Sequence, residues 1–293
     1  MILTRELPLP PLFKRGFPVR TISCIHPLLK RGGRGSFSFF FFLFFIFFSF
    51  SAFAQTFVSL KPNITETLID LGASDKIIGI TKFCVKPNAQ AAVIADYQNI
   101  NVEALLRLHP DFILLSKENT QKKQFEQLDM AFANSQTQIV VLGFDTVEEF
   151  FTSYVKLAEL LKQDAAAKER VVNWKNQLEQ VRRDHHALSH QTFAIIVQRE
   201  PLIVASGHTY LSSLLSTMGL ENVFTANQIP YPTLNPETLL QKHPDLLFDM
   251  SHHASDNPQF WGQTVIPIKI EDFLAHPKSV ENAMRLVTSA AKP

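Results

Sequence analysis

The sequence predicts an α/β protein of two lobes, each with a central, mainly parallel sheet flanked by helices, joined by one long rigid helix. Three observations predict this. Strand-like apolar runs alternate with helical periods in both halves of the chain, a pattern typical of parallel sheets covered on both faces. A 15-residue pattern of the first half returns in the second. Between the halves, residues 165–188 contain no Gly or Pro, as expected of one unbroken helix.

The N-terminal segment 1–54 has the composition of a secretory signal. Residues 1–36 carry seven Lys or Arg and one acid, Glu6, and an apolar run, Phe39–Phe48, precedes Ala52-Phe-Ala54. A basic leader, a short apolar run and an Ala-x-Ala site predict a signal peptide cleaved after Ala54 and a periplasmic protein. The run is short for a membrane span, which needs about 20 residues, although an uncleaved anchor remains the alternative. The leader is long, so the true start codon stays open.

The remaining residues have a mildly acidic balance. Seven of the 28 basic and one of the 27 acidic residues lie in 1–54, so 21 basic and 26 acidic residues remain. This balance argues against nucleic acid as a partner. Cys24 lies in the leader, which leaves Cys84 alone. One cysteine cannot form an intrachain disulfide, and the role of Cys84 stays undetermined.

The first lobe is expected at residues 55–162. Asn63-Ile-Thr-Glu66 has the spacing of a helix-starting capping box, Gly72 ends that helix, and 82–100 is expected to be an irregular connection. The expected strands are Thr56–Leu60, Lys76–Thr81, Phe112–Leu115 and Gln138–Leu142, and the later helices are Asn101–Leu108, Gln121–Asn134 and Val147–Leu161.

The joining helix is expected within 163–189 and the second lobe at 190–293. Val171, Trp174, Leu178 and Val181 form a single apolar stripe, and about 24 residues would span roughly 36 Å. The second lobe then continues with strand Thr192–Gln198, a turn at 199–201, strand Leu202–Ala205, helix Tyr210–Met218, and a further helix, strand and helix.

The repeat is the strongest feature of the sequence. Tyr97, Asn101, Glu103, the Leu105-Leu106 pair and His109-Pro-Asp111 return 134 residues later, so that eight positions of a 15-residue frame match. This offset is too long for a solenoid unit and indicates two equivalent lobes. In each copy we expect Asn to cap a helix, both Leu to face the sheet, and His-Pro-Asp to end the helix.

Two matched pairs allow more than one interpretation. Glu103 and Glu237 either stabilise a helix N-terminus or form paired carboxylates for a two-fold symmetric basic partner. Tyr97 and Tyr231 either clamp a flat ligand at the carboxyl ends of the strands or pack under their own loops.

Taken in order, these motifs resemble the substrate-binding proteins for iron chelates and cobalamin, in which a rigid helix joins two lobes. The resemblance covers nearly all of 56–293. It is carried by Val58-Ser-Leu-Lys-Pro62, Gly79-Ile-Thr-Lys-Phe83, Ala205-Ser-Gly207, Gly219-Leu-Glu-Asn222 and the two repeat copies. It implies a monomeric binding component of an ABC importer, not an enzyme. Such a protein closes only slightly on its ligand and needs no cofactor beyond a ligand that is itself a metal chelate.

The resemblance also implies a site. One glutamate of each lobe, Glu103 and Glu237, would dock onto the permease dimer. A cobalamin, haem or ferric siderophore ligand would lie in a cleft whose aromatic residues are Phe83, Tyr97 and Tyr231. Tyrosines stand where cobalamin receptors have tryptophans, and Ser116 replaces an aromatic, so the ligand stays open. The remaining candidates at loop or turn positions are Lys82, Gln198, Arg199 and His208. Arg199 either pairs with ligand carboxylates or is an exposed hairpin residue.

Other functions have less support in the sequence. A zinc or manganese receptor would need converging His and carboxylate ligands, whereas His109 is the one histidine of the first lobe, and His185-His186 and His252-His253 are adjacent pairs that do not face one site. No metal site is therefore predicted. An exported enzyme would need a catalytic motif, and the sequence has no phosphate loop, nucleophile elbow or His-Glu-x-x-His. A scaffold that kept the fold would have lost the docking carboxylates, and both are present.

Overall fold

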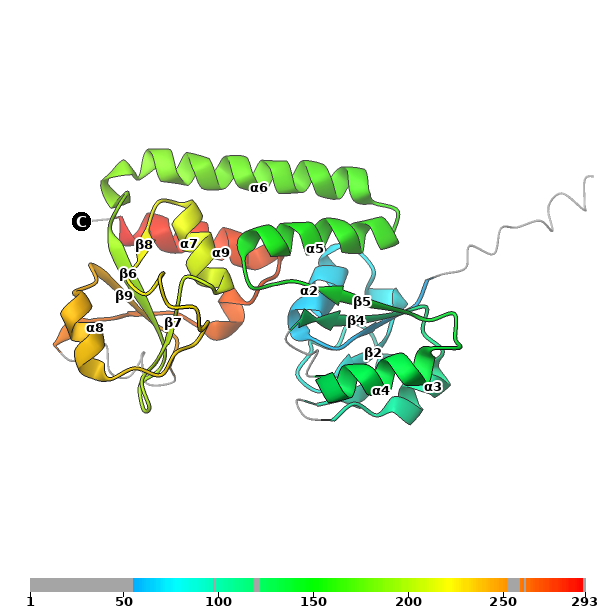
Figure 1. Cartoon of the computed structure of the whole chain (residues 1–293). Helices are drawn as coiled ribbons and strands as arrows, with labels where there is room; N and C mark the ends of the chain where they lie inside the picture. The colour runs from blue at the N-terminus through cyan, green and yellow to red at the C-terminus, as the bar shows by residue number, and fades with distance from the viewer. Residues whose placement is uncertain (1–54, 97–98, 118–121, 252–258, 261, 292–293) are drawn as a thin grey trace, which may run out of the picture. The chain divides into compact units, whose positions relative to one another are not determined.

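The fold was analysed in a computed structural model, which describes residues 55–293 except 97–98, 118–121, 252–258, 261 and 292–293 (Figure 1). All described residues belong to one compact unit, Phe53–Pro293. The predicted signal peptide, Tyr97 and the His252-His253 pair lie outside the described residues. No described helix is long and apolar enough to cross a membrane.

The first lobe is built on a five-stranded parallel sheet in the order β3-β2-β1-β4-β5. Its central strands are buried on both faces, and the rings of Phe57 and Phe112 stack at 5.2 Å. The strands are β1 (Phe57–Ser59), β2 (Ile77–Thr81), β3 (Ala92–Ala95), β4 (Phe112–Ser116) and β5 (Gln138–Leu142). The helices are α2 (Pro62–Asp70), α3 (Val102–Leu108), α4 (Lys122–Phe132) and α5 (Val147–Leu160), with a 3-10 turn η1 at Ser74–Lys76.

Two predictions for this lobe were wrong. The helix α2 begins at Pro62 with Lys61 as N-cap, not at a capping box on Asn63, because proline has no N–H and a φ suited to the first helical position. The expected irregular connection contains the edge strand β3. This strand has only four residues, which is too few to show a clear hydrophobic periodicity. In addition, Val93 is 61% exposed, so the strand lacks the pattern of a buried strand.

The second lobe has a mixed sheet in the order β12-β9-β6-β7, with β8 paired to β6. Only β7 runs antiparallel in it, because a tight hairpin joins β7 to β6. The strands are β6 (Thr192–Gln198), β7 (Ile203–Ala205), β8 (Glu221–Asn222), β9 (Leu246–Asp249) and β12 (Ile266–Pro267), beside a small hairpin of β10 (Gln259–Phe260) and β11 (Gln263–Thr264). The helices are α7 (Tyr210–Thr217), α8 (Pro236–Lys242), α9 (Pro277–Ala290) and the 3-10 helix η4 (Ile270–Phe273).

The joining segment is the single helix α6 (Asp164–Asp184), followed by a 3-10 turn η3 at His186–Leu188. Its 21 residues span roughly 31 Å. Val171, Trp174 and Leu178 are buried as the stripe predicted, whereas Val181 is only partly buried. The charged face of the helix carries ion pairs such as Lys168–Asp164 at 2.9 Å.

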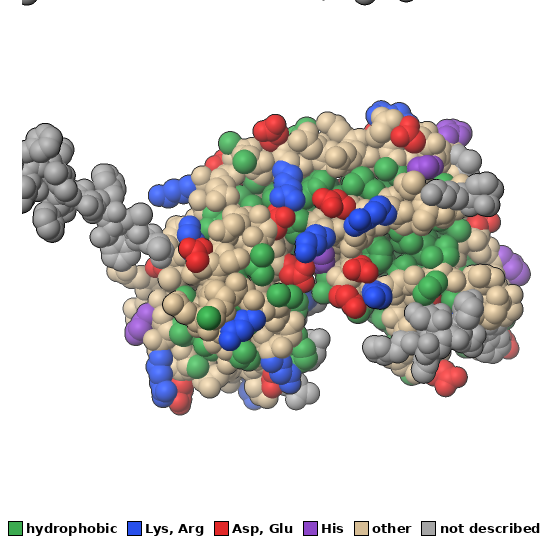
Figure 2. All heavy atoms as spheres, turned by 180° about the vertical axis from the view of Figure 1, so that it is seen from behind, with side chains coloured by type: hydrophobic (Ala, Val, Ile, Leu, Met, Phe, Trp, Pro, Cys, Tyr) green, Lys and Arg blue, Asp and Glu red, His purple; other side chains and the backbone are tan. Residues whose placement is uncertain are grey.

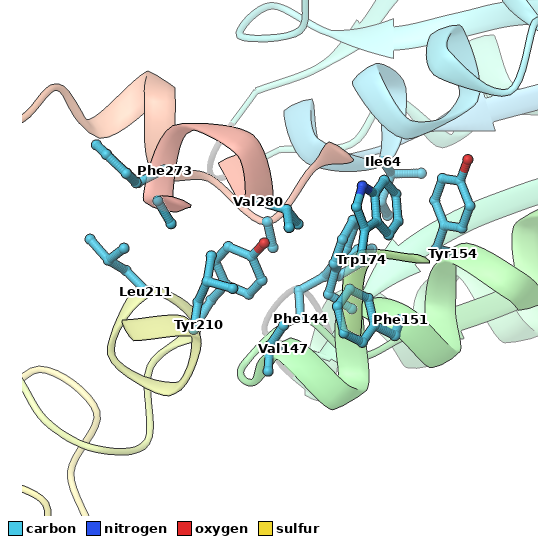
Figure 3. Packing of buried hydrophobic residues seen from close by; sticks show 14 of the residues in the cluster. Ile64, Phe144, Val147, Phe151, Tyr154, Trp174, Tyr210, Leu211, Phe273 and Val280 are labelled. Atoms are coloured by element: carbon cyan, nitrogen blue, oxygen red, sulfur yellow. The ribbon is translucent and has the colours of Figure 1, made fainter. Parts of the chain in front are cut away.

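The lobes share a continuous apolar core, so α6 is not their only connection. One cluster extends from Phe57 of the first sheet to Phe193 of the second, and Figure 3 shows part of its packing around Trp174 and Tyr210. At its centre the ring of Phe150 in α5 lies 5.9 Å from Trp174 of α6 and 5.7 Å from Tyr210 of α7. A hydrogen bond from the Val147 N–H to the Ser213 hydroxyl, at 2.8 Å, links α5 to α7. This packing opposes large movement between the sheets.

The sequence repeat corresponds to a repeated geometry. His109 and His243 end their helices in the left-handed region, with φ of 46° and 43°. The aspartate that follows in each copy accepts a hydrogen bond from a residue at the start of the first strand of its lobe. Asp111 accepts from the N–H of Thr56, and Asp245 from the N–H of Thr192, each at 2.8 Å.

The predicted caps of the repeat are confirmed, because the Asn101 and Asn235 side chains accept from backbone N–H groups of α3 and α8. The prediction that both leucines of each pair face the sheet was wrong. Leu105 and Leu239 are buried, but Leu106 is 39% exposed and Leu240 only partly buried. Adjacent helix positions point about 100° apart, so one apolar stripe cannot bury both.

Candidate functional site

A cavity of about 530 Å³ lies between the two sheets. It is lined by both lobes and is mostly apolar. The first lobe contributes Leu60, Lys61, Pro62, Asn63, Thr81, Phe83, Asp96 and Phe144. The second contributes Ile195, Val197, Ala205, Thr209, Tyr210, Leu211, Tyr231, Met250, Ile270, Phe273, Leu274 and Ala275. The volume falls within the range of about 300–1,000 Å³ that holds small molecules and cofactors.

Strand direction positions much of this wall. Leu60 follows β1, Thr81 ends β2, Asp96 follows β3 and Met250 follows β9. Parallel strands carry their carboxyl ends to one edge of a sheet, where ligands of open α/β folds bind. The cavity therefore lies where the carboxyl edges of both sheets meet.

Several polar groups of the wall bond within the protein. The Thr81 hydroxyl contacts the Cys84 thiol at 3.2 Å, and the Thr209 hydroxyl donates to the Ser206 carbonyl at 3.0 Å. The Tyr210 hydroxyl lies 2.7 Å from the Ser279 hydroxyl, and burial raises the pKa of Tyr210 far above its ordinary value. Tyr210 is thus a neutral phenol at physiological pH and offers no phenolate to a metal.

The acidic wall residue Asp96 has a basic neighbour. The Lys82 ammonium lies 4.0 Å from an Asp96 carboxylate oxygen and 4.9 Å from the centre of the Phe83 ring. Lys82 therefore supports two residues of the wall without itself lining the cavity. On the wider surface, Figure 2 shows acidic and basic side chains interspersed on the face that it presents.

Two of the predicted cleft residues line the cavity from opposite lobes. Phe83 is 39% exposed and Tyr231 57% exposed, so both rings have surface available to a ligand. Tyr97 lies outside the described residues.

The other predicted cleft residues do not line the cavity. Ser116 is buried at the end of β4. The Gln198 side chain donates to the Glu200 carbonyl at 2.7 Å, within its own hairpin. His208 is exposed on the loop before α7.

Arg199 is not the exposed hairpin residue that one interpretation expected, and it does not line the cavity. Its Nε donates to a carboxylate oxygen of Asp249 at 2.8 Å, and the side chains are 10% and 0% exposed. The guanidinium also lies over the Phe260 ring at 5.2 Å. Arg199 is thus a buried structural partner of Asp249, since β9 brings that carboxylate against the end of β6.

Most residues of the apolar wall were not predicted from the sequence. Phe144 and Met250 could have been found as residues that closely follow predicted strands, whereas Asp96 follows β3, which the sequence did not predict. Phe273, Leu274 and Ala275 carried no such signal, because they belong to η4 and the segment before α9, and only the packing of that segment brings them to the cavity.

Glu103 and Glu237 occupy equivalent places in the first turns of α3 and α8, and both are exposed. The Glu103 carboxylate is 3.8 Å from Arg107, and both side chains are more than 80% exposed. Such a pair contributes little to stability, so both carboxylates are available at the surface.

The described residues contain no group of three or more His, Cys, Asp or Glu that could hold a metal ion. Two histidines considered as metal ligands lie at helix ends instead. His109 ends α3 in a left-handed conformation, and His185 is the C-cap residue of α6.

Comparison with known families matches residues 57–277 to the family described as periplasmic binding protein. This chain belongs to that family. Periplasmic binding proteins are a class of binding proteins rather than enzymes, and the match spans both lobes and the joining helix. The chain is therefore a substrate-binding protein with the two-lobed fold that the sequence predicted.

Curated relatives of this periplasmic binding protein include two vitamin B12-binding proteins. That of Vibrio campbellii is 24% identical over 212 residues, which cover 72% of this chain and 75% of the relative. That of Pectobacterium atrosepticum is 26% identical over 227 residues, covering 74% and 80%.

Solved structures show the same fold at lower identity. The periplasmic vitamin B12 binding protein of Vibrio cholerae superposes with a TM-score of 0.68 at 21% identity, covering 81% of this chain and 96% of that one. The periplasmic haem-binding protein of Vibrio cholerae gives a TM-score of 0.67 at 16% identity, covering 81% and 99%.

Proposed function

We propose that this periplasmic binding protein captures a bulky metal chelate of the cobalamin, haem or ferric siderophore class and delivers it to an ABC importer. The observation that carries the proposal is the mostly apolar cavity between the two sheets, with an aromatic residue of each lobe in its wall. Relatives and structural neighbours named for vitamin B12 or haem support the same ligand class.

The chemistry of the cavity favours a large ligand with apolar faces. Phe83 and Tyr231 offer ring surface from opposite sides, and flat macrocycles stack well on such rings. Burying apolar area contributes about 25 cal/mol per Å², so these walls would bind a macrocycle better than a hydrated ion. The polar Thr81, Thr209 and Tyr210 groups, engaged within the protein, leave the apolar faces dominant.

The partner proposed for delivery is a permease dimer with basic residues related by two-fold symmetry. Glu103 and Glu237 support it, since they lie at matched positions of the two lobes and are both exposed. Complementary charge across such an interface mainly sets register and the rate of encounter.

The proposal includes export, a single subunit and limited closure. Residues 1–54 would direct export and be removed after Ala54, and the binding protein would act as a monomer. The continuous core around Phe150, Trp174 and Tyr210 supports only small closure on ligand, because packed interiors deform little.

The test is direct binding by the exported protein. The chain, produced with its own leader, is isolated from the periplasm, and its visible spectrum and native mass are recorded. It is then titrated with cyanocobalamin, haemin and ferrichrome. At least one should bind with a spectral change, and the Phe83→Ala/Tyr231→Ala variant should bind that ligand about tenfold or more weakly, from lost aromatic contact.

A matched control is Met130→Ala in α4, which removes an apolar side chain that is 71% exposed and does not line the cavity. Its affinity should equal that of the wild type. Absence of binding to all three chelates by protein with a normal thermal transition would refute the proposed ligand class.

A further inference from the structure

A polar side chain in the wall of the cavity has a donor group that the protein does not use. Asn63 is 5% exposed and lines the cavity. Its Oδ1 accepts from the N–H of Ile64 at 3.0 Å, and among the hydrogen bonds of the described residues its Nδ2 makes none. Because Nδ2 is not one of the buried, unpartnered side-chain atoms of the described residues, it is accessible from the cavity and can donate to a ligand there.

The orientation of this amide follows from the same hydrogen bond. An N–H can only donate, so the atom of Asn63 that faces the Ile64 N–H is the oxygen, and the NH₂ group faces the other way. The hydroxyls of Thr81, Thr209 and Tyr210 have partners in the protein. Asn63 differs from them because it keeps a donor for something inside the cavity.

The helix terminus at this point adds positive potential. Lys61, Pro62 and Asn63 form the N-cap and first turn of the nine-residue helix α2, and all three line the cavity. The N-cap Lys61 makes no side-chain capping bond, and no acid lies in the first turn. Pro62 has no N–H and the Ile64 N–H is already bonded to Asn63 Oδ1, so the terminus contributes mainly the positive end of the helix dipole, which favours an anionic oxygen.

We infer that Asn63 and the N-terminus of α2 form a subsite for a peripheral carboxylate of the bound chelate. The Nδ2 group donates to a carboxylate oxygen, and the positive end of the helix dipole supplies the favourable potential. This inference rests on the proposed function and narrows it to chelates that carry free carboxylates. Asn63 is thus a specificity-determining residue, and chelates whose periphery carries only esters or amides bind more weakly.

The test uses ligand pairs that differ in the carboxylates alone. The probes are haemin and its dimethyl ester, and cyanocobalamin monocarboxylic acid and cyanocobalamin itself. The wild type should bind the carboxylate member of the pair it accepts about tenfold or more tightly. A hydrogen bond to a charged group supports a difference of about 10- to 100-fold.

The decisive variant is Asn63→Asp. It retains an oxygen for the Ile64 N–H and places a negative charge at a helix N-terminus, which protects stability, but it removes the donor and repels a carboxylate. Affinity for the carboxylate probe should fall about 10- to 100-fold, while affinity for the ester or amide probe stays within about twofold. The matched control is Asn101→Asp, at the N-cap of α3 outside the cavity, which should change neither affinity.

The outcomes are distinguishable. A wild type that binds a chelate without preference for the carboxylate member overturns the inference and leaves the proposed function intact. The inference is equally overturned if Asn63→Asp weakens both members of a pair alike. A wild type that binds neither pair overturns the inference, and failure with ferrichrome as well overturns the proposed ligand class.

Discussion

Replacing Arg199 by methionine separates a structural role for this residue from a role in ligand binding. Its Nε lies 2.8 Å from a carboxylate oxygen of Asp249, whose side chain is fully buried. The other Asp249 oxygen accepts from the Ser251 N–H at 2.7 Å. In Arg199→Met the carboxylate would keep this single bond and lose its counter-charge.

The expected loss of stability follows from that burial. Removing one partner of a buried ion pair costs about 3–5 kcal/mol, because the remaining charge is uncompensated. For a domain of this size each kcal/mol lowers Tm by about 2–4 °C, so Tm should fall by about 6–20 °C. Adding Asp249→Asn removes the buried charge and should recover at least half of the loss.

Urea unfolding followed by circular dichroism measures the loss of stability, and chelate titration measures the change in ligand affinity. Together they distinguish a structural role of Arg199 from a role in ligand binding. Arg182→Met serves as control, since the Arg182 side chain is 55% exposed and its guanidinium lies 3.6 Å from the Glu179 carboxylate, and such surface pairs contribute about 0–1 kcal/mol. A loss below about 1 kcal/mol for Arg199→Met, combined with lost chelate affinity, would refute the structural role and restore Arg199 to the ligand site.

Three further perturbations test other parts of the structure. The Glu103→Gln/Glu237→Gln variant should bind chelate like the wild type but fail to stimulate its permease in vesicles; normal transport would remove these residues from docking. Hydrogen bonds from the N–H and hydroxyl of Thr192 hold the pKa of Asp245 below its ordinary 3.8, so this carboxylate stabilises the fold above that pH and loses its effect as pH falls below it. The urea midpoint of Asp245→Asn should therefore approach that of the wild type between about pH 6 and about pH 3, and parallel curves would contradict this. At Gly207 a Cβ would lie 2.6 Å from the Thr225 hydroxyl and 2.9 Å from its Cα, so Gly207→Ala should cost about 1–3 kcal/mol in calorimetry, whereas an unchanged Tm would show that the loop yields.

The sequence predicted most of the fold because its signals are local or repeated. The stripe of Val171, Trp174 and Leu178 predicted α6, and the buried run of β4 predicted a central strand. The edge strand β3 escaped, since Val93 points to solvent and a short strand without alternation resembles a loop.

The site was less predictable than the fold. Phe83 and Tyr231 were identified through a family resemblance, and both line the cavity. Arg199 and Ser116 stood at plausible chain positions, but side-chain direction and burial decide whether such a residue reaches the cavity. Asn63 was assigned to a helix cap, and its place in the cavity wall became visible only once α2 was seen to begin at Pro62.

The sequence by itself determined the two lobes and the joining helix, because periodicity and repetition depend on residues near one another in the chain, and the order of its motifs carried the resemblance to the family. Only the tertiary structure decided which side chains meet: Asp249 with Arg199 across 50 residues, or Asn63 with Phe273 around one cavity. Such contacts depend on the packing of whole elements, where a shift of one residue or a rotation of a helix exchanges a buried partner for solvent.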